Sequence, residues 1–259
     1  MLTSTHNSRI QLARTLLRGS KERRLTGAFA AEGVRLVEEA LRADWPFRFV
    51  LTAENLGERA QALVANLNAK QVETIMVADN LMHSISGTET SQGILAILEE
   101  QHLPMPKALS MVLIPDQIRD PGNLGSLLRS AAAAGVQAVL LPPETADAFA
   151  PKVVRAGMGA HFRLPILRFG WDEIRNAAQG LKVLLADMQA STPCWQADFR
   201  GPFALIVGGE AEGASPSARE MATSNVFIPM PGRSESLNAA AAGAILLFEA
   251  VRQRSAKSQ

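Results

Sequence analysis

The loop at residues 228–238 combines a rigid backbone with polar side chains that could contact a small ligand. It follows a strand-like run and reads Ile228-Pro-Met-Pro-Gly-Arg-Ser-Glu-Ser-Leu-Asn238. Pro229 and Pro231 hold φ near the value of an extended chain, so little conformational entropy is lost when a ligand binds here. Ser236 and Asn238 supply polar groups. A plain strand-to-helix connector with Ser236 as the helix N-cap explains the same residues.

Arg129 lies on a predicted helix that follows the turn Asp120-Pro-Gly-Asn123. The helix has an apolar face made of Leu124, Leu127, Leu128, Ala131 and Ala132. Arg129 lies off that face, and Gly125 and Ser126 precede it by one turn. These small neighbours leave space for a ligand beside the guanidinium. On spacing alone, an ordinary surface arginine is the favoured interpretation.

Residues 203–215 predict a buried strand that runs into a glycine-rich turn and the start of a helix. Gly208, Gly209 and Gly213 would let the backbone approach a ligand closely. The turn is neither G-x-G-x-x-G nor a P-loop. Glu210 and Glu212 would repel a nucleotide phosphate, so a cationic or neutral nucleoside-like ligand suits this turn better.

Basic residues cluster in two segments, although the net charge of the 259-residue chain is only +1. The first segment lies within residues 1–24, and the second within 147–172. Their basic residues are Arg9, Arg14, Arg18, Lys21, Arg23 and Arg24, then Lys152, Arg155, Arg163 and Arg168. Such clusters suggest an anionic partner such as RNA, and a solvated surface with chance clustering is the alternative.

The remaining composition excludes several classes of protein. Cys194 is the single cysteine, so an internal disulfide and a cysteine-rich zinc site are excluded. The four histidines have no ligand spacing, and we expect no metal. No run of about 18 apolar residues predicts a membrane span. The basic N-terminus weakly resembles a transit peptide, but an integral helix over residues 10–17 is preferred, and we expect a cytoplasmic protein.

The pattern of elements predicts an α/β protein in two parts. Residues 1–100 alternate between helices and short strands, and residues 101–109 contain two prolines without periodicity, which is typical of a linker. From residue 110 onward, strands alternate with helices up to a long terminal helix. This alternation predicts a parallel sheet covered on both faces.

Three segments in order resemble the motifs of the SpoU (TrmH-like) RNA ribose 2′-O-methyltransferases, which belong to the SPOUT superfamily. They are residues 120–129, Val207-Gly-Gly-Glu-Ala-Glu-Gly213 and residues 228–238. Residues 151–162 are also similar to that family. The second motif commonly reads Gly-Asn-Glu, whereas this chain has glycine at 209, so a side-chain role at that position is in doubt.

The N-terminal part resembles the substrate-binding domain of the same family, whose fold is like that of ribosomal proteins L30e and L7Ae. The similarity runs from Asn7 through Arg35, and residues 88–93 resemble its closing segment. The resemblance implies an L30e/L7Ae-like domain at 1–100 and, after the linker at 101–109, a SPOUT methyltransferase domain at 110–259. It further implies a parallel sheet with a deep trefoil knot, and a homodimer.

The implied reaction is S-adenosylmethionine-dependent 2′-O-methylation of a ribose in structured RNA, most simply 23S-type large-subunit ribosomal RNA. The implied cofactor contacts are Gly208, Gly209, Gly213, Ile228, Met230 and Leu237. The implied catalytic residues are Arg129, Asn123, Glu210, Ser236 and Asn238. A guanidinium is a poor proton acceptor, so we favour Arg129 binding a phosphate or a developing alkoxide over a role as base.

Contacts with RNA phosphates are expected from Arg23, Arg24, Lys152 and Arg155. Aromatic residues are few and tyrosine is absent, so phosphate contacts should dominate over base stacking. A tRNA 2′-O-methyltransferase and a non-catalytic RNA-binding protein are the alternatives within this fold. A dinucleotide oxidoreductase is disfavoured because G-x-G-x-x-G is absent and acids occupy positions 210 and 212.

Overall fold

The computed structural model describes residues 1–86, 91–210, 212–232 and 236–255, and the chain divides into two compact units. Unit 1 contains residues 1–101 and 149–162, and unit 2 contains 102–148 and 163–259. The chain therefore passes between the units three times. This division differs from the sequence-based one, in which 149–162 belonged to the second domain. Residues 88–90 of the expected closing segment lie outside the described residues.

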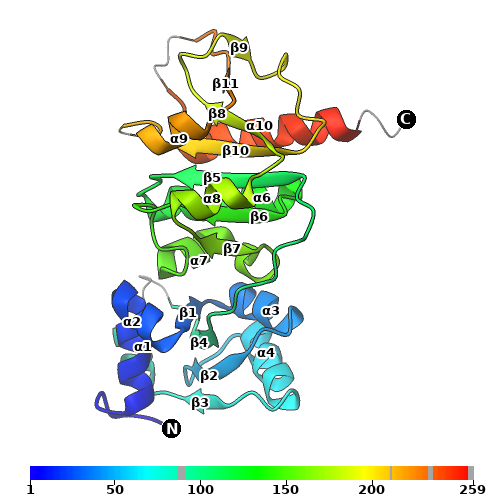
Figure 1. The fold of residues 1–259 in the computed structure, drawn as a ribbon. Helices are drawn as coiled ribbons and strands as arrows, with labels where there is room; N and C mark the ends of the chain where they lie inside the picture. Colours follow the sequence, from blue (N-terminus) through cyan, green and yellow to red (C-terminus); the bar gives the residue numbers. More distant parts are fainter. Residues whose placement is uncertain (87–90, 211, 233–235, 256–259) are drawn as a thin grey trace. The chain divides into compact units, whose positions relative to one another are not determined.

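Unit 1 is built around a four-stranded mixed sheet of order β1-β4-β2-β3, in which only β2 and β3 pair in parallel. Figure 1 shows its elements in chain order. They are α1 (Ser8–Arg18), α2 (Ser20–Thr26), β1 (Ala28–Glu32), α3 (Val34–Arg42), β2 (Phe47–Thr52), α4 (Glu58–Ala69), β3 (Thr74–Met76), α5 (Asp79–Ile85), β4 (Ile94–Glu99), α7 (Pro151–Gly157) and the 3-10 helix η1 (Ala160–Phe162).

Aromatic packing explains why residues 149–162 belong to unit 1. The ring of Phe29 on β1 lies 5.0 Å from that of Phe149 and 6.5 Å from that of Phe162. Trp45 packs edge-on against Phe162 at 5.2 Å. All four side chains are buried. Burying such large rings contributes strongly to stability, so these contacts hold the segment in unit 1.

Unit 2 contains a seven-stranded sheet of order β7-β6-β5-β10-β8-β11-β9, in which every pairing is parallel, as the sequence predicted. Its elements are β5 (Met111–Asp116), α6 (Pro121–Ala134), β6 (Ala138–Leu141), β7 (Ile166–Arg168), α8 (Trp171–Ala177), β8 (Lys182–Ala186), β9 (Thr192–Pro193), β10 (Phe203–Gly208), α9 (Pro216–Met221), β11 (Ser224–Phe227) and α10 (Ala239–Ser255).

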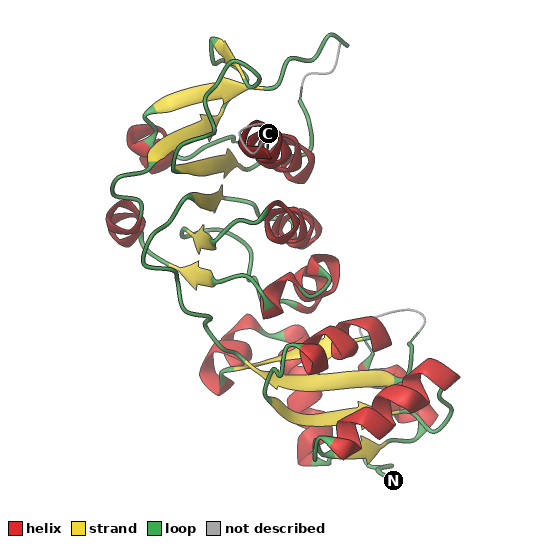
Figure 2. Cartoon of the chain, turned by 90° about the vertical axis from the view of Figure 1, so that its right-hand side faces the viewer, coloured by secondary structure: helices red, strands yellow, loops and turns green. Residues whose placement is uncertain are grey.

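Helices cover both faces of this sheet, with α8 and α9 on one side and α6 and α10 on the other (Figure 2). The central strands are buried on both faces, which is why they read as continuous apolar runs. α6 and α10 pack so closely that a Cβ at Gly243 would lie 2.4 Å from a methyl carbon of Leu127. Small residues in α10 therefore serve this approach. Within the described residues, no helix is long and apolar enough to cross a membrane.

The terminal helix begins later than the sequence suggested, and its cap is a different residue. α10 starts at Ala239, and the side-chain Oδ1 of Asn238 accepts hydrogen bonds from the backbone N–H groups of Ala240 (3.0 Å) and Ala241 (3.2 Å). The alternative interpretation of this loop, a plain connector with Ser236 as the helix N-cap, is therefore wrong in its choice of cap. Asparagine caps a helix as well as serine does, and here it lies directly before the first turn.

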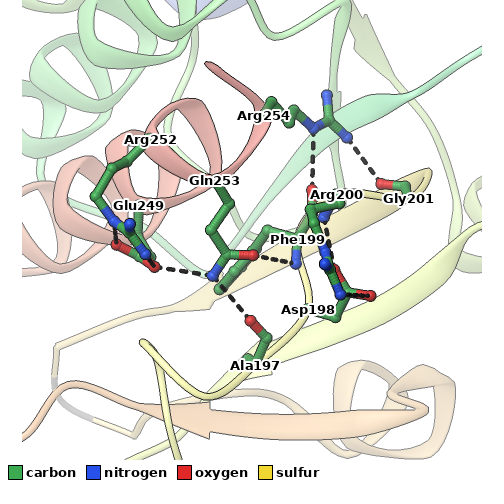
Figure 3. Close-up of polar contacts among 9 residues, drawn as sticks. All are labelled: Ala197, Asp198, Phe199, Arg200, Gly201, Glu249, Arg252, Gln253 and Arg254. Atoms are coloured by element: carbon green, nitrogen blue, oxygen red, sulfur yellow. Dashed lines mark hydrogen bonds and ion pairs between the residues drawn. The ribbon is translucent and has the colours of Figure 1, made fainter. Parts of the chain in front are cut away.

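The C-terminal turn of α10 is fixed to the loop before β10 by the side chains of Gln253 and Arg254 (Figure 3). Gln253 accepts a hydrogen bond from the N–H of Phe199 and donates to the carbonyl of Ala197. Arg254 donates to the carbonyl oxygens of Phe199 (2.9 Å), Gly201 (2.8 Å) and Ser110 (2.8 Å). Burial lowers the pKa of Arg254. One guanidinium thus satisfies three carbonyl groups from two chain segments.

Replacing Arg254 with alanine should lower the free energy of unfolding by about 2 kcal/mol, because partly buried carbonyl groups would lose their donor. Urea denaturation followed by circular dichroism measures this change. Arg252 is the matched control, since it lies two residues away in the same helix and, among the described residues, pairs locally with Glu249. An Arg254→Ala protein as stable as Arg252→Ala would contradict this account.

Candidate active site

A cavity of about 330 Å³ lies at the carboxyl ends of the parallel strands in unit 2. This is the edge at which parallel α/β sheets bind ligands. The cavity is bounded by the ends of β8, β10 and β11, by the loop after β11, and by the first turns of α10. All six residues predicted to contact a cofactor line it: Gly208, Gly209, Gly213, Ile228, Met230 and Leu237.

Three of the predicted catalytic residues meet beside this cavity. The carboxylate Oε1 of Glu210 accepts hydrogen bonds from the side-chain amides of Asn123 and, at 3.1 Å, Asn238. The Asn238 amide also donates to Oδ1 of Asn123 at 2.8 Å. These residues come from the first turn of α6, the turn after β10 and the cap of α10. The sequence separates them by up to 115 residues, and the fold joins them into one polar cluster.

The start of α6 is itself held in place by a side-chain cap. Asp120 accepts a hydrogen bond from the backbone N–H of Asn123 at 2.8 Å, and Pro121 occupies the first helical position. Because Asn123 lies in this capped turn, its amide reaches Glu210 from a fixed backbone.

The glycine turn after β10 has no room for side chains at two positions. A Cβ on Gly208 would lie 2.6 Å from the backbone nitrogen of Ala214 and from the carbonyl carbon of Gly213. A Cβ on Gly209 would lie 2.4 Å from the carbonyl oxygen of Gln117. Gly209 and Gly213 also exchange two backbone hydrogen bonds of 3.1 Å. Gly208, Gly209 and Gly213 thus contribute backbone atoms to the lining of the cavity, to which Glu210 also belongs.

Asp116 ties this turn to the neighbouring strand β5. Its Oδ2 accepts a hydrogen bond from the N–H of Ser215 at 2.6 Å, while Oδ1 is buried with no hydrogen-bond partner in the part of the chain that the structure describes. Burial raises the pKa of Asp116, and the hydrogen bond from Ser215 opposes that rise. This hydrogen bond thus links the carboxyl end of β5 to the segment that follows the glycine turn after β10.

Two other predicted catalytic residues lie outside the cluster of Asn123, Glu210 and Asn238. Arg129 is exposed on α6 and makes no hydrogen bond or ion pair with the described residues. Ser236 is exposed and lines the cavity beside Glu210. Arg129 is therefore available to a ligand, and Ser236 borders the space that a ligand would fill.

The basic residues predicted to bind RNA have unequal surroundings in unit 1. Arg23 is only 4% exposed, and its guanidinium donates to the carbonyl of Leu16 at 2.5 Å. It is therefore unsuited to phosphate contact, which corrects the prediction. Arg24 and Lys152 are exposed, and half-buried Arg155 lies 3.7 Å from the carboxylate of Glu32.

Sequence comparison assigns both parts of the chain. Residues 110–248 match the SpoU rRNA Methylase family, and residues 7–96 match the MRM3-like substrate binding domain. The chain belongs to the SpoU rRNA methylase family. This match contains the cavity, the cluster of Asn123, Glu210 and Asn238, and the exposed Arg129.

Relatives match along nearly the full chain. The 23S rRNA (guanosine(2553)-2′-O)-methyltransferase RlmP of Bacillus subtilis is 35% identical over 90% of this chain and 92% of its own length. The crystal structure of the SpoU methyltransferase AviRb from Streptomyces viridochromogenes, in complex with AdoMet, has a TM-score of 0.87 and 31% identity. That match covers 96% of this chain and 99% of the AviRb chain. An AdoMet-bound rRNA methyltransferase from Sinorhizobium meliloti has a TM-score of 0.85 and 31% identity, over 97% of both chains.

Several residues that line the cavity were not predicted from the sequence. Asp187 directly follows β8, and Arg219 lies on α9. A buried strand ending in an acid was visible in the sequence, but which strand lies beside β10 was not. Only the sheet order, with β8 next to β10, brings Asp187 to the glycine turn.

Proposed function

We propose that this protein methylates a ribose 2′-hydroxyl of 23S-type large-subunit ribosomal RNA, with S-adenosylmethionine as the methyl donor. The observation that carries the proposal is the cavity at the carboxyl ends of β8, β10 and β11, where the six residues of the second and third motifs meet. The polar cluster of Asn123, Glu210 and Asn238 borders the same cavity. The activities named for the relatives above support this substrate class.

The residues of the cavity fit S-adenosylmethionine. Gly208, Gly209 and Gly213 line the cavity, and because glycine has no side chain, we assign the nucleoside of the cofactor to a place against their backbone. Leu237, Leu246 and Ile228 supply apolar contacts. The volume is within the range of pockets that bind small ligands. When bound, the cofactor supplies an electrophilic methyl group on a sulfonium.

The residues of the cluster then position and polarise the ribose. Glu210 is held by two side-chain amides through Oε1, and we assign its other oxygen to a hydrogen bond from the ribose. Arg129 contributes a guanidinium, whose donors can stabilise the negative charge on a phosphate or a developing alkoxide. Positioning and electrostatic stabilisation are the main contributions expected of the protein in such a transfer.

We assign RNA binding chiefly to unit 1, because its residues 7–96 match a substrate-binding domain. Arg24 and Lys152 are exposed cations on this unit and are the favoured phosphate contacts. Arg155 would have to exchange Glu32 for a phosphate. Binding through phosphate contacts should weaken as the salt concentration rises.

Three further features belong to this proposal: a trefoil knot, a homodimer and a cytoplasmic location. β11 pairs with both β8 and β9, and α10 then packs against α6, which supports the knot. Ile245 and Phe248 on α10 are 42% and 48% exposed, which suits burial against a second copy.

Transfer of labelled methyl groups to purified 23S ribosomal RNA and transfer RNA tests the function. We expect label in 23S RNA, released on alkaline hydrolysis only as an alkali-resistant dinucleotide, because a 2′-O-methyl group blocks cleavage at its own ribose. Heat-denatured protein is the control for carry-over of label. Label confined to transfer RNA, or recovered on a base, would contradict the proposal.

A further inference from the structure

Asp187 and Arg219 form an ion pair in the lining of the cavity, at a place that none of the three motifs includes. Oδ2 of Asp187 accepts a hydrogen bond from Nη1 of Arg219 at 2.7 Å. The side chain of Asp187 is 12% exposed and that of Arg219 is 50% exposed. Both residues line the cavity together with the glycine turn. The acid is therefore part of the enclosed site, and the guanidinium lies between the site and solvent.

The carboxylate of Asp187 is fixed in position and charge. Its Oδ1 accepts a hydrogen bond from the backbone N–H of Gln189 at 3.0 Å, and its own N–H donates to the carbonyl of Val226 on β11 at 2.9 Å. The Gln189 N–H and the Arg219 guanidinium hold the pKa of Asp187 below its ordinary value, against the opposing effect of burial. Asp187 is therefore an anion at neutral pH.

Arg219 keeps donors available for a ligand. A guanidinium has five N–H donors, and within the described part of the chain the hydrogen bonds of Arg219 use Nη1 alone. Its Nη2 lies 3.5 Å from where a Cβ of Gly213 would be, so the guanidinium lies over the glycine turn. Among the described residues that line the cavity, Arg219 is the only cation, and Asp187 and Glu210 are the only acids.

We propose that the Asp187–Arg219 pair binds the amino-acid end of the methyl donor, with Arg219 contacting its carboxylate and Asp187 its ammonium group. This inference rests on the proposed function. A zwitterion and an ion pair attract each other most strongly when their charges are aligned in opposite directions. Glu210 would repel the carboxylate, so among the described residues that line the cavity, Arg219 is the one side chain that can neutralise it. The adenosine part would then contact the glycine turn and the apolar residues of α10.

Comparing how two ligands bind to wild-type and variant proteins tests whether the Asp187–Arg219 pair contacts the amino-acid end of the cofactor. S-adenosylhomocysteine carries the amino-acid end, whereas 5′-methylthioadenosine keeps the adenosine and the thioether but lacks that end. Calorimetric titration should show that Arg219→Gln binds S-adenosylhomocysteine about 10- to 100-fold more weakly than the wild type does. This is the effect expected from the loss of a charge-assisted hydrogen bond. The affinity of Arg219→Gln for 5′-methylthioadenosine should change less than twofold. Asp187→Asn should give the same pattern.

Arg175→Gln is the matched control. Arg175 lies on α8, pairs with Glu220 of α9 at 2.9 Å and is half-buried outside the cavity, so neither affinity should change. Thermal unfolding of each variant verifies that it is folded, and Arg219→Lys should recover part of the lost affinity because it keeps the charge. Equal loss of both ligands, or no loss of either, would overturn the inference while the proposed function stands. A wild-type protein that binds neither ligand would instead overturn the proposed function.

Discussion

Replacing Arg129 with lysine is expected to lower kcat for RNA methylation by about 100- to 1,000-fold while leaving the stability of the protein unchanged. Loss of a group that stabilises charge in the transition state commonly has this effect on kcat. Lysine keeps the positive charge but lacks the planar arrangement of donors with which a guanidinium binds an oxyanion through two hydrogen bonds.

Stability should be unaffected because of where Arg129 lies. It is exposed on α6, opposite the buried face of Leu124, Leu127 and Leu128, and it contacts none of the described residues through a hydrogen bond or ion pair. Lysine is also as good a helix former as arginine. The effect on activity can therefore be separated from any effect on folding.

Single-turnover methylation of 23S RNA, with thermal unfolding measured in parallel, tests this expectation. Arg175→Lys is the control for an arginine-to-lysine change elsewhere in the same unit. If Arg129→Lys keeps full activity, the two-hydrogen-bond role of the guanidinium is excluded, and a point charge is sufficient at that position.

Replacing Gly208 with alanine should abolish measurable cofactor binding and lower the free energy of unfolding by about 1–3 kcal/mol, the range for overpacked sites. The new Cβ would lie 2.6 Å from backbone atoms of Gly213 and Ala214. Backbone atoms cannot rotate away as a flexible side chain could, so the turn itself must move. That movement would displace the groups that we expect to hold the cofactor.

Gly201→Ala is the matched control for this change. Gly201 lies in the loop just before β10, and a Cβ there would meet nothing within 4 Å. Calorimetric titration with S-adenosylhomocysteine and urea denaturation measure the two effects. Cofactor affinity in Gly208→Ala equal to that in Gly201→Ala would show that the turn tolerates displacement and is not the binding surface.

Position 209 departs from the family motif, and the structure gives a physical reason for the glycine there. The family motif commonly has asparagine there, and this chain has glycine. A Cβ at 209 would lie 2.4 Å from the carbonyl oxygen of Gln117, whose φ is +54°. A side chain at position 209 would therefore collide with the turn after β5. This contact joins distant segments, so it could not be detected from the local sequence.

The sequence by itself determined which segments form helices or strands and which chemical groups the motifs carry. Uninterrupted apolar runs predicted the buried parallel strands. A helix after the turn at residues 120–123 was also predicted, and it is present as α6, although it begins at Pro121 because Asp120 caps it. The ordered motifs contain some of the residues that line the cavity, but not Asp187 or Arg219. These inferences succeed because each depends on neighbours in the chain.

Only the tertiary structure decided which of these residues meet, because contacts between distant segments depend on strand order and packing. The order of the seven strands brings Asp187 beside the glycine turn. Aromatic burial moves residues 149–162 into unit 1, and burial removes Arg23 from the surface. Asn238 serves as both helix cap and partner of Glu210, in a loop whose stiffness was visible but whose contacts were not.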